Sequence, residues 1–228
     1  MFATPTPRAP SAAPAAVLVS LVFALAYAAS NHLTALRADV GTGVFDWEHT
    51  IPFVPWTIVP YLSIVPLFVA SFFVGRSHGA LRRHTRRLLL LLALALAGWA
   101  LCPLRFAFER PPVEGWAGAL FELLALLDRP YNRAPSLHIG VLVLLWLHLG
   151  PRLAGWWRAA LGGWLLLIGV SVLTTWQHHV IDIPAGAAAA LLCVLLTRRP
   201  TSPCPAPAGT PLPSRRASWR RRTCPARP

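Results

Sequence analysis

Six apolar runs constrain the fold of this chain more than any other feature. They are separated by polar connections and carry few charged residues (15–30, 54–74, 88–104, 136–149, 156–175 and 182–196). A helix of about 20 apolar residues crosses a bilayer, and a helix satisfies its own backbone hydrogen bonds within lipid. We therefore expect an all-α fold: a polytopic membrane helix bundle with six transmembrane helices.

Composition agrees with a membrane protein. The 228 residues are 55% hydrophobic and only 13% charged, which is too apolar for an ordinary soluble domain. The net charge of +13 comes from arginine alone, and the arginines cluster in loops and in the tail. A nucleic-acid-binding protein would gather them on one soluble face, so no nucleic-acid partner is expected. The 4 cysteines show neither metal-type spacing nor a disulfide framework, and we expect no metal and no cofactor.

The two ends of the chain differ from its centre. Residues 1–14 are rich in Pro, Ala and Thr, and residues 198–228 are rich in Pro, Arg and Ser, so both are expected to be disordered. The membrane domain then covers residues 15–197. Ala26-Tyr27-Ala28 resembles a signal-peptide cleavage site, but a retained first span gives an even span count and consistent loop charges. Residues 114–127 have apolar positions at helical spacing, which predicts an amphipathic helix in the interface.

The charges of the loops predict the orientation. With six spans, the basic loop 75–87, the turn 150–155 and the tail fall on one side together with the N-terminus. All 8 acidic residues fall on the other side or at its boundary. The positive-inside rule then places both termini in the cytoplasm. In a bacterium, this would be an inner-membrane protein whose polar loops face the periplasm.

This topology brings three polar segments, 105–111, 134–138 and 174–182, to the same outer face. His178 and Asp182 are four residues apart, so on a helical turn the carboxylate can orient the imidazole. The pair alone is equally compatible with a hydrogen bond that only fixes a helix end. Ser136 is placed to cap the fourth span, with His138 in the first turn beside it. Arginines in these segments are natural ligands for a phosphoryl group.

These residues carry a resemblance to a known family. Pro135-Ser136-Leu137-His138 followed by His178-x-x-x-Asp182 resembles the second and third motifs of the type 2 phosphatidic acid phosphatase superfamily. Arg105 to Pro111 resembles a shortened first motif. The Ser-Leu-His form and the paired histidines are similar to the inositol phosphotransferase branch, which includes inositol phosphorylceramide synthases. A further similarity is to a bacterial membrane domain often fused to a dual-specificity phosphatase, through residues 45–48, 51–56 and 173–179.

The resemblance implies a metal-independent reaction on a membrane phospholipid or lipid phosphate. His178 would be the nucleophile that forms a phosphohistidine, Asp182 would orient it, and His138 would protonate the leaving oxygen. The phosphate oxygens would be held by three further side chains (Arg105, Arg110 and Ser136). Water as acceptor gives a lipid phosphatase, whereas a lipid alcohol gives a head-group transferase.

Some features depart from the family pattern. The third motif usually has Arg after Ser, but here Val172 follows Ser171, so one phosphate ligand is missing. Arg133 or Arg129 is a candidate substitute. No Cys-x5-Arg loop follows the sixth apolar run, so a soluble phosphatase partner is one expectation, and a chain that works alone is the other. The missing arginine also leaves open a non-catalytic membrane scaffold.

Overall fold

The structure, a computed structural model, describes residues 12–74 and 77–198. Within these ranges most residues are helical and none belongs to a strand. Their seven α-helices are α1 Ala12–Ala35, α2 Ile58–Ser71, α3 His78–Leu101, α4 Gly115–Leu127, α5 Leu137–Leu149, α6 Gly155–Thr174 and α7 Asp182–Leu196. Short 3₁₀ helices cover Asp46–Thr50, Pro55–Thr57 and Gly150–Arg152. The predicted all-α class is confirmed. Of the ends predicted to be disordered, residues 1–11 and 199–228 lie outside the described residues, whereas residues 12–14 form the start of α1 and that part of the prediction is wrong.

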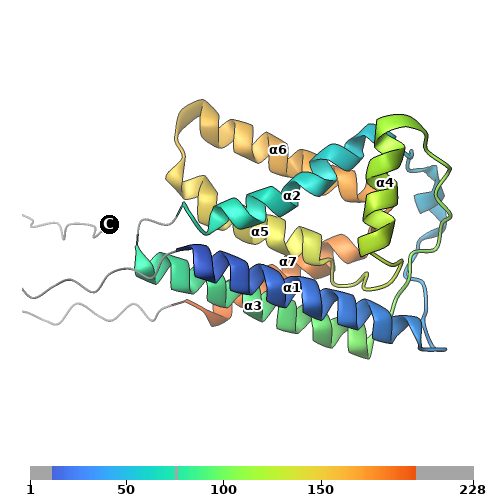
Figure 1. Cartoon of the computed structure of the whole chain (residues 1–228), viewed down its shortest axis with the longest axis horizontal. Helices are drawn as coiled ribbons and strands as arrows, with labels where there is room; N and C mark the ends of the chain where they lie inside the picture. Colours follow the sequence, from blue (N-terminus) through green and yellow to red (C-terminus); the bar gives the residue numbers. More distant parts are fainter. Residues whose placement is uncertain (1–11, 75–76, 199–228) are drawn as a thin grey trace, which may run out of the picture. The chain divides into compact units, whose positions relative to one another are not determined.

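Successive long helices run in alternating directions, as Figure 1 shows. The C-terminal ends of α1, α3 and α6 therefore lie beside the N-terminal ends of α2, α5 and α7. Backbone bonds tie this end together: the Val54 N–H donates to the Thr174 carbonyl at 2.8 Å, and the Ser136 N–H donates to the Asp182 carbonyl at 3.2 Å. We call this the outer end. The opposite end, where α2 and α5 finish and α3 begins, is the inner end.

Helix α4 is the exception, because it lies across the outer end of the bundle (Figure 1). Its buried face is formed by Ala117, Phe121 and Leu124, which pack in one cluster with residues of α2. Trp116 and Leu126 point away from that face and are 62% and 83% exposed. A helix is therefore present at the predicted residues 114–127, but it is only weakly amphipathic, because its exposed face also carries apolar side chains.

Three helices are long and apolar enough to cross a membrane: α1, α3 and α6. Helices α2, α5 and α7 are apolar but have only 14, 13 and 15 residues, fewer than the roughly 20 of an ordinary span. The outward faces are apolar too, since Leu25 of α1 and Leu166 of α6 are each 70% exposed. Exposed apolar surface on this scale fits contact with lipid better than contact with water.

The main core lies between α1, α2, α3, α5, α6 and α7, with Leu88, Leu91, Leu144, Leu145 and Ile168 among its fully buried members. A close approach of α7 to α5 depends on Gly186. A Cβ at this position would overlap the Ser136 carbonyl oxygen. The small residue therefore brings the first turn of α7, which carries Asp182, against the N-terminus of α5, which carries Ser136.

Candidate active site

Three side chains at the outer end form a hydrogen-bonded relay. His178 Nδ1 lies 3.1 Å from Asp182 Oδ2, and His178 Nε2 lies 3.1 Å from Ser136 Oγ. Asp182 and Ser136 are fully buried, and His178 is 8% exposed. With Nδ1–H donating to the carboxylate, the lone pair of Nε2 faces the serine hydroxyl. The structure thus joins three predicted site residues from two separate segments.

Backbone bonds hold the loop that carries His178. The N–H groups of Gln177 and His178 both donate to the Val172 carbonyl, at 3.1 and 3.0 Å. The preceding residue, Trp176, has φ 51°, a left-handed conformation that an aromatic residue rarely adopts, and it reverses the chain after α6. At the other end of the loop, the His179 N–H donates to Asp182 Oδ2 at 2.9 Å. The imidazole is therefore anchored from both sides.

Ser136 has the predicted role of a helix cap. Its Oγ accepts a hydrogen bond from the Ile139 N–H at 3.3 Å, and its φ and ψ are extended. The hydroxyl proton remains available to His178 Nε2. The N-terminus of α5, with its favourable dipole for anions, therefore lies directly beside the nucleophile proposed from sequence.

His138 does not contact the relay. Its Nε2 lies 3.0 Å from the Tyr61 carbonyl oxygen, which can only accept, so Nε2 carries the proton. The ring stacks on Tyr61 with centroids 4.2 Å apart. A proton delivered by His138 must therefore leave from Nδ1, and only when the ring is an imidazolium.

Two arginines converge on a cavity of about 610 Å³ at the outer end. Arg110 lies over the Phe121 ring and Arg133 over the Phe106 ring, each with 5.6 Å from guanidinium carbon to ring centroid. Neither arginine forms an ion pair with a carboxylate within the described ranges. Burial, and then the positive charge of Arg133, lower the pKa of Arg110, and both effects would favour a bound anion in this cavity.

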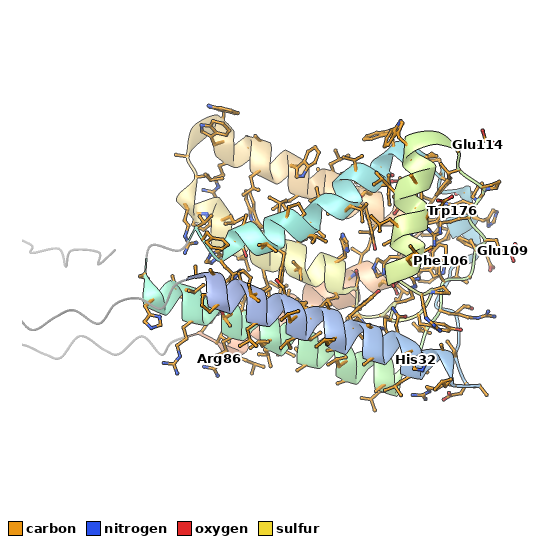
Figure 2. All side chains as sticks on the ribbon, viewed as in Figure 1. His32, Arg86, Phe106, Glu109, Glu114 and Trp176 are labelled. Carbon is orange, nitrogen blue, oxygen red and sulfur yellow. The ribbon has the colours of Figure 1, made fainter. Side chains whose placement is uncertain are left out.

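Arg133 connects this cavity to the relay. It is only 3% exposed, lines the cavity, and donates to the Gln177 carbonyl oxygen next to His178. Ser136, His178 and Asp182 are not part of the cavity lining. Phe106 and Trp176, also in the lining, lie together at the outer end in Figure 2, whereas Arg86 lies at the inner end.

Arg105 does not join Arg110 and Arg133 in the lining of this cavity. Its backbone N–H bonds the Gly41 carbonyl at 2.9 Å, but its side chain is exposed and does not line the cavity. The absence of an arginine at position 172, where the resemblance described above would require one, has a physical explanation. Val172 is fully buried in an apolar cluster with Ile58 and Ile139, where a guanidinium would lose its hydration without a partner.

Sequence reasoning missed one buried side chain. Glu48, from the 3₁₀ helix Asp46–Thr50, bonds His179 across 131 residues of chain. No local pattern signals this contact, because Glu48 belongs to a loop that looks solvated in the sequence. In the described part of the chain, no three His, Cys, Asp or Glu side chains gather as metal ligands.

Comparison with known proteins does not identify the chain. No protein-family model matches it, and no curated protein matches it either.

Proposed function

We propose that this chain is an integral membrane enzyme with six spans that removes or transfers a phosphoryl group on a lipid at the outer membrane face. The alternating directions of six helices support the topology, with α2, α5 and α7 as short spans (Figure 1). In this orientation both termini are cytoplasmic, and in a bacterium the site faces the periplasm.

The observation that carries the chemistry is the Asp182–His178–Ser136 relay. A carboxylate on Nδ1 fixes the tautomer that leaves Nε2 free to attack, and it stabilises the imidazolium that forms. In the proposed step His178 Nε2 forms a bond to phosphorus while the bond from phosphorus to the leaving oxygen breaks. That oxygen takes its proton from Nδ1 of His138, which must be an imidazolium for this step. Water then attacks phosphorus, the bond from phosphorus to His178 Nε2 breaks, and the water returns a proton to His138.

Charge stabilisation comes from side chains and backbone of the chain itself. Arg110 and Arg133 face the cavity without carboxylate partners in the described residues, as expected of groups that bind an anionic head group. The N–H groups at the start of α5 would bind oxygens next to Ser136. Arg133 thus supplies the guanidinium that Val172 does not, while Arg105 would join only after its side chain reorients.

The first test is phosphate release by detergent-purified protein from phosphatidic acid and other lipid phosphates, with a chelator present. We expect the wild type to release phosphate and His178→Ala to lose activity by at least about a thousandfold. His148→Gln at the inner end is the matched control and should keep the wild-type rate per folded molecule. Release that persists in His178→Ala would overturn the assigned nucleophile.

A second chemistry is favoured by one contact. Ser136 Oγ on His178 Nε2, with Asp182 on Nδ1, is also the arrangement that activates a serine nucleophile. The trapped intermediate separates the two routes, because phosphohistidine is lost in acid and phosphoserine is not. The arginines favour the phosphoryl substrate in both cases.

The acceptor decides between hydrolase and transferase. Adding a lipid alcohol to the assay should leave a phosphatase producing free phosphate, whereas a head-group transferase would make a new phospholipid. A folded wild type that forms neither product nor intermediate would support the non-catalytic scaffold, with a soluble phosphatase as its partner.

A further inference from the structure

A second carboxylate–imidazole pair lies beside the relay and has no role in the proposed reaction. His179 Nδ1 lies 2.8 Å from Glu48 Oε2, and these residues are 1% and 2% exposed. His179 Nε2 accepts a hydrogen bond from the Ala107 N–H at 3.0 Å. Since that backbone group can only donate, Nε2 carries no proton and Nδ1–H donates to Glu48. With both nitrogens occupied, His179 is not available as a nucleophile.

The pair joins three segments that are far apart in sequence. Glu48 Oε2 also accepts from the Val180 N–H at 3.1 Å, and Glu48 Oε1 accepts from the Phe45 N–H at 3.1 Å. Through Ala107, the imidazole reaches the segment that carries Phe106 and Phe108 in the cavity wall. One buried glutamate therefore connects its own loop, the loop of His178 and one wall of the cavity.

The contacts continue as far as Arg133. The His179 ring stacks on Phe106 with centroids 4.4 Å apart, and Arg133 lies over the same Phe106 ring. Arg133 in turn donates to the carbonyl of Gln177, which precedes His178. The His179 N–H also donates to Asp182 Oδ2, the oxygen that binds His178. A displacement of His179 would thus disturb both the orientation of His178 and the arginine beside it.

We propose that Glu48 and His179 form a positioning pair, which holds the His178 loop and the arginine-lined cavity in the arrangement needed for phosphoryl transfer. The inference rests on the proposed function for its effect on rate. The claim that Glu48 fixes the surroundings of His178 without contacting it concerns structure alone, so it can be tested whether or not the protein is an enzyme.

The test compares Glu48→Gln with Asp46→Asn, which removes the same charge from an exposed position of the same 3₁₀ helix. Histidine ¹⁵N NMR of the detergent-solubilised protein reports the Nδ1–H of His178. We expect Glu48→Gln to move this signal and to speed its exchange with water, because the loop that carries His178 loses the hydrogen bond from His179 to Glu48. Asp46→Asn should leave it unchanged. An unchanged His178 signal in folded Glu48→Gln would overturn the proposal.

The kinetic readout separates positioning from a merely structural role. On phosphatidic acid, kcat per folded molecule should fall about 10–100-fold in Glu48→Gln, with a much smaller change in KM. Glu48→Asp keeps the charge and should recover part of kcat. If Glu48→Gln does not fold, His179→Gln, which breaks the same pair from its other side, replaces it in both measurements. Loss explained entirely by the unfolded fraction would contradict the pair's role. A wild type without activity would refute the proposed function, while the NMR comparison would still decide the positioning.

Discussion

Each end of the bundle has a pair of buried histidines close to a serine, but the two pairs differ in what their imidazoles contact. At the outer end, His178 and His179 each bond a carboxylate through Nδ1. At the inner end, His84 Nε2 lies 2.8 Å from Ser71 Oγ, and His148 Nε2 lies 3.1 Å from the Ser71 carbonyl. The two inner rings stack with centroids 3.9 Å apart.

The inner end has no carboxylate among the described residues, and this explains why its imidazoles have different partners. The Ser71 hydroxyl donates to the Phe68 carbonyl at 2.6 Å, so its oxygen accepts from His84, and the Ser71 carbonyl accepts from His148. Both inner imidazoles therefore use Nε2–H as a donor to α2. All 8 acidic residues lie in the outer segments or at their boundary. These hydrogen bonds orient the inner rings, but without a carboxylate neither ring is stabilised as a cation, so we interpret the inner pair as a packing contact.

The largest predicted effect comes from breaking the carboxylate contact of His178. Asp182→Asn keeps the shape of the side chain but favours the wrong imidazole tautomer. We expect kcat for phosphate release to fall by about 10³–10⁴-fold, as in other relays of this kind. Helix content by circular dichroism should stay at the wild-type level. A loss smaller than tenfold would mean that the carboxylate does not activate His178.

The next largest effect is predicted where α7 packs closely against the start of α5 at the outer end. Gly186→Ala adds a Cβ that overlaps the Ser136 carbonyl oxygen, so we expect a loss of about 1–3 kcal/mol in the free energy of unfolding. The matched control is Gly163→Ala in α6, where a Cβ meets nothing within 4 Å. It should be neutral, or more stable by up to about 1 kcal/mol. Denaturant unfolding in detergent measures both, and equal stabilities would argue against the close packing.

The smallest effect is predicted at the inner end. Ser71→Ala removes the hydroxyl that accepts from His84, and it should cost about 1 kcal/mol of stability. Because this end has no place in the proposed reaction, kcat and KM should match the wild type at a temperature where both proteins are folded. A fall in kcat of folded Ser71→Ala would show that the inner end takes part in the reaction, contrary to the proposal.

Much of the site could be predicted from the sequence because its parts are local. The spacing of four between His178 and Asp182, and the place of Ser136 before an apolar run, follow from helix geometry alone. To predict that Ser136 and His178 lie close together, the charges of the loops were needed as well, because they placed both segments on the same side of the membrane. His138 shows the limit of this reasoning: its position in the first turn was predictable, but its bond to the Tyr61 carbonyl was not.

The sequence by itself determined that the chain is helical, apolar and asymmetric in charge, because periodicity, hydropathy and arginine placement are properties of short segments. Only the tertiary structure decided which polar groups meet. It brought Glu48 to His179 and Arg133 to the Gln177 carbonyl, and it left Arg105 exposed. Such contacts join segments separated by tens of residues, and their partners are selected by the packing of helices such as α5 against α7, which no local pattern encodes.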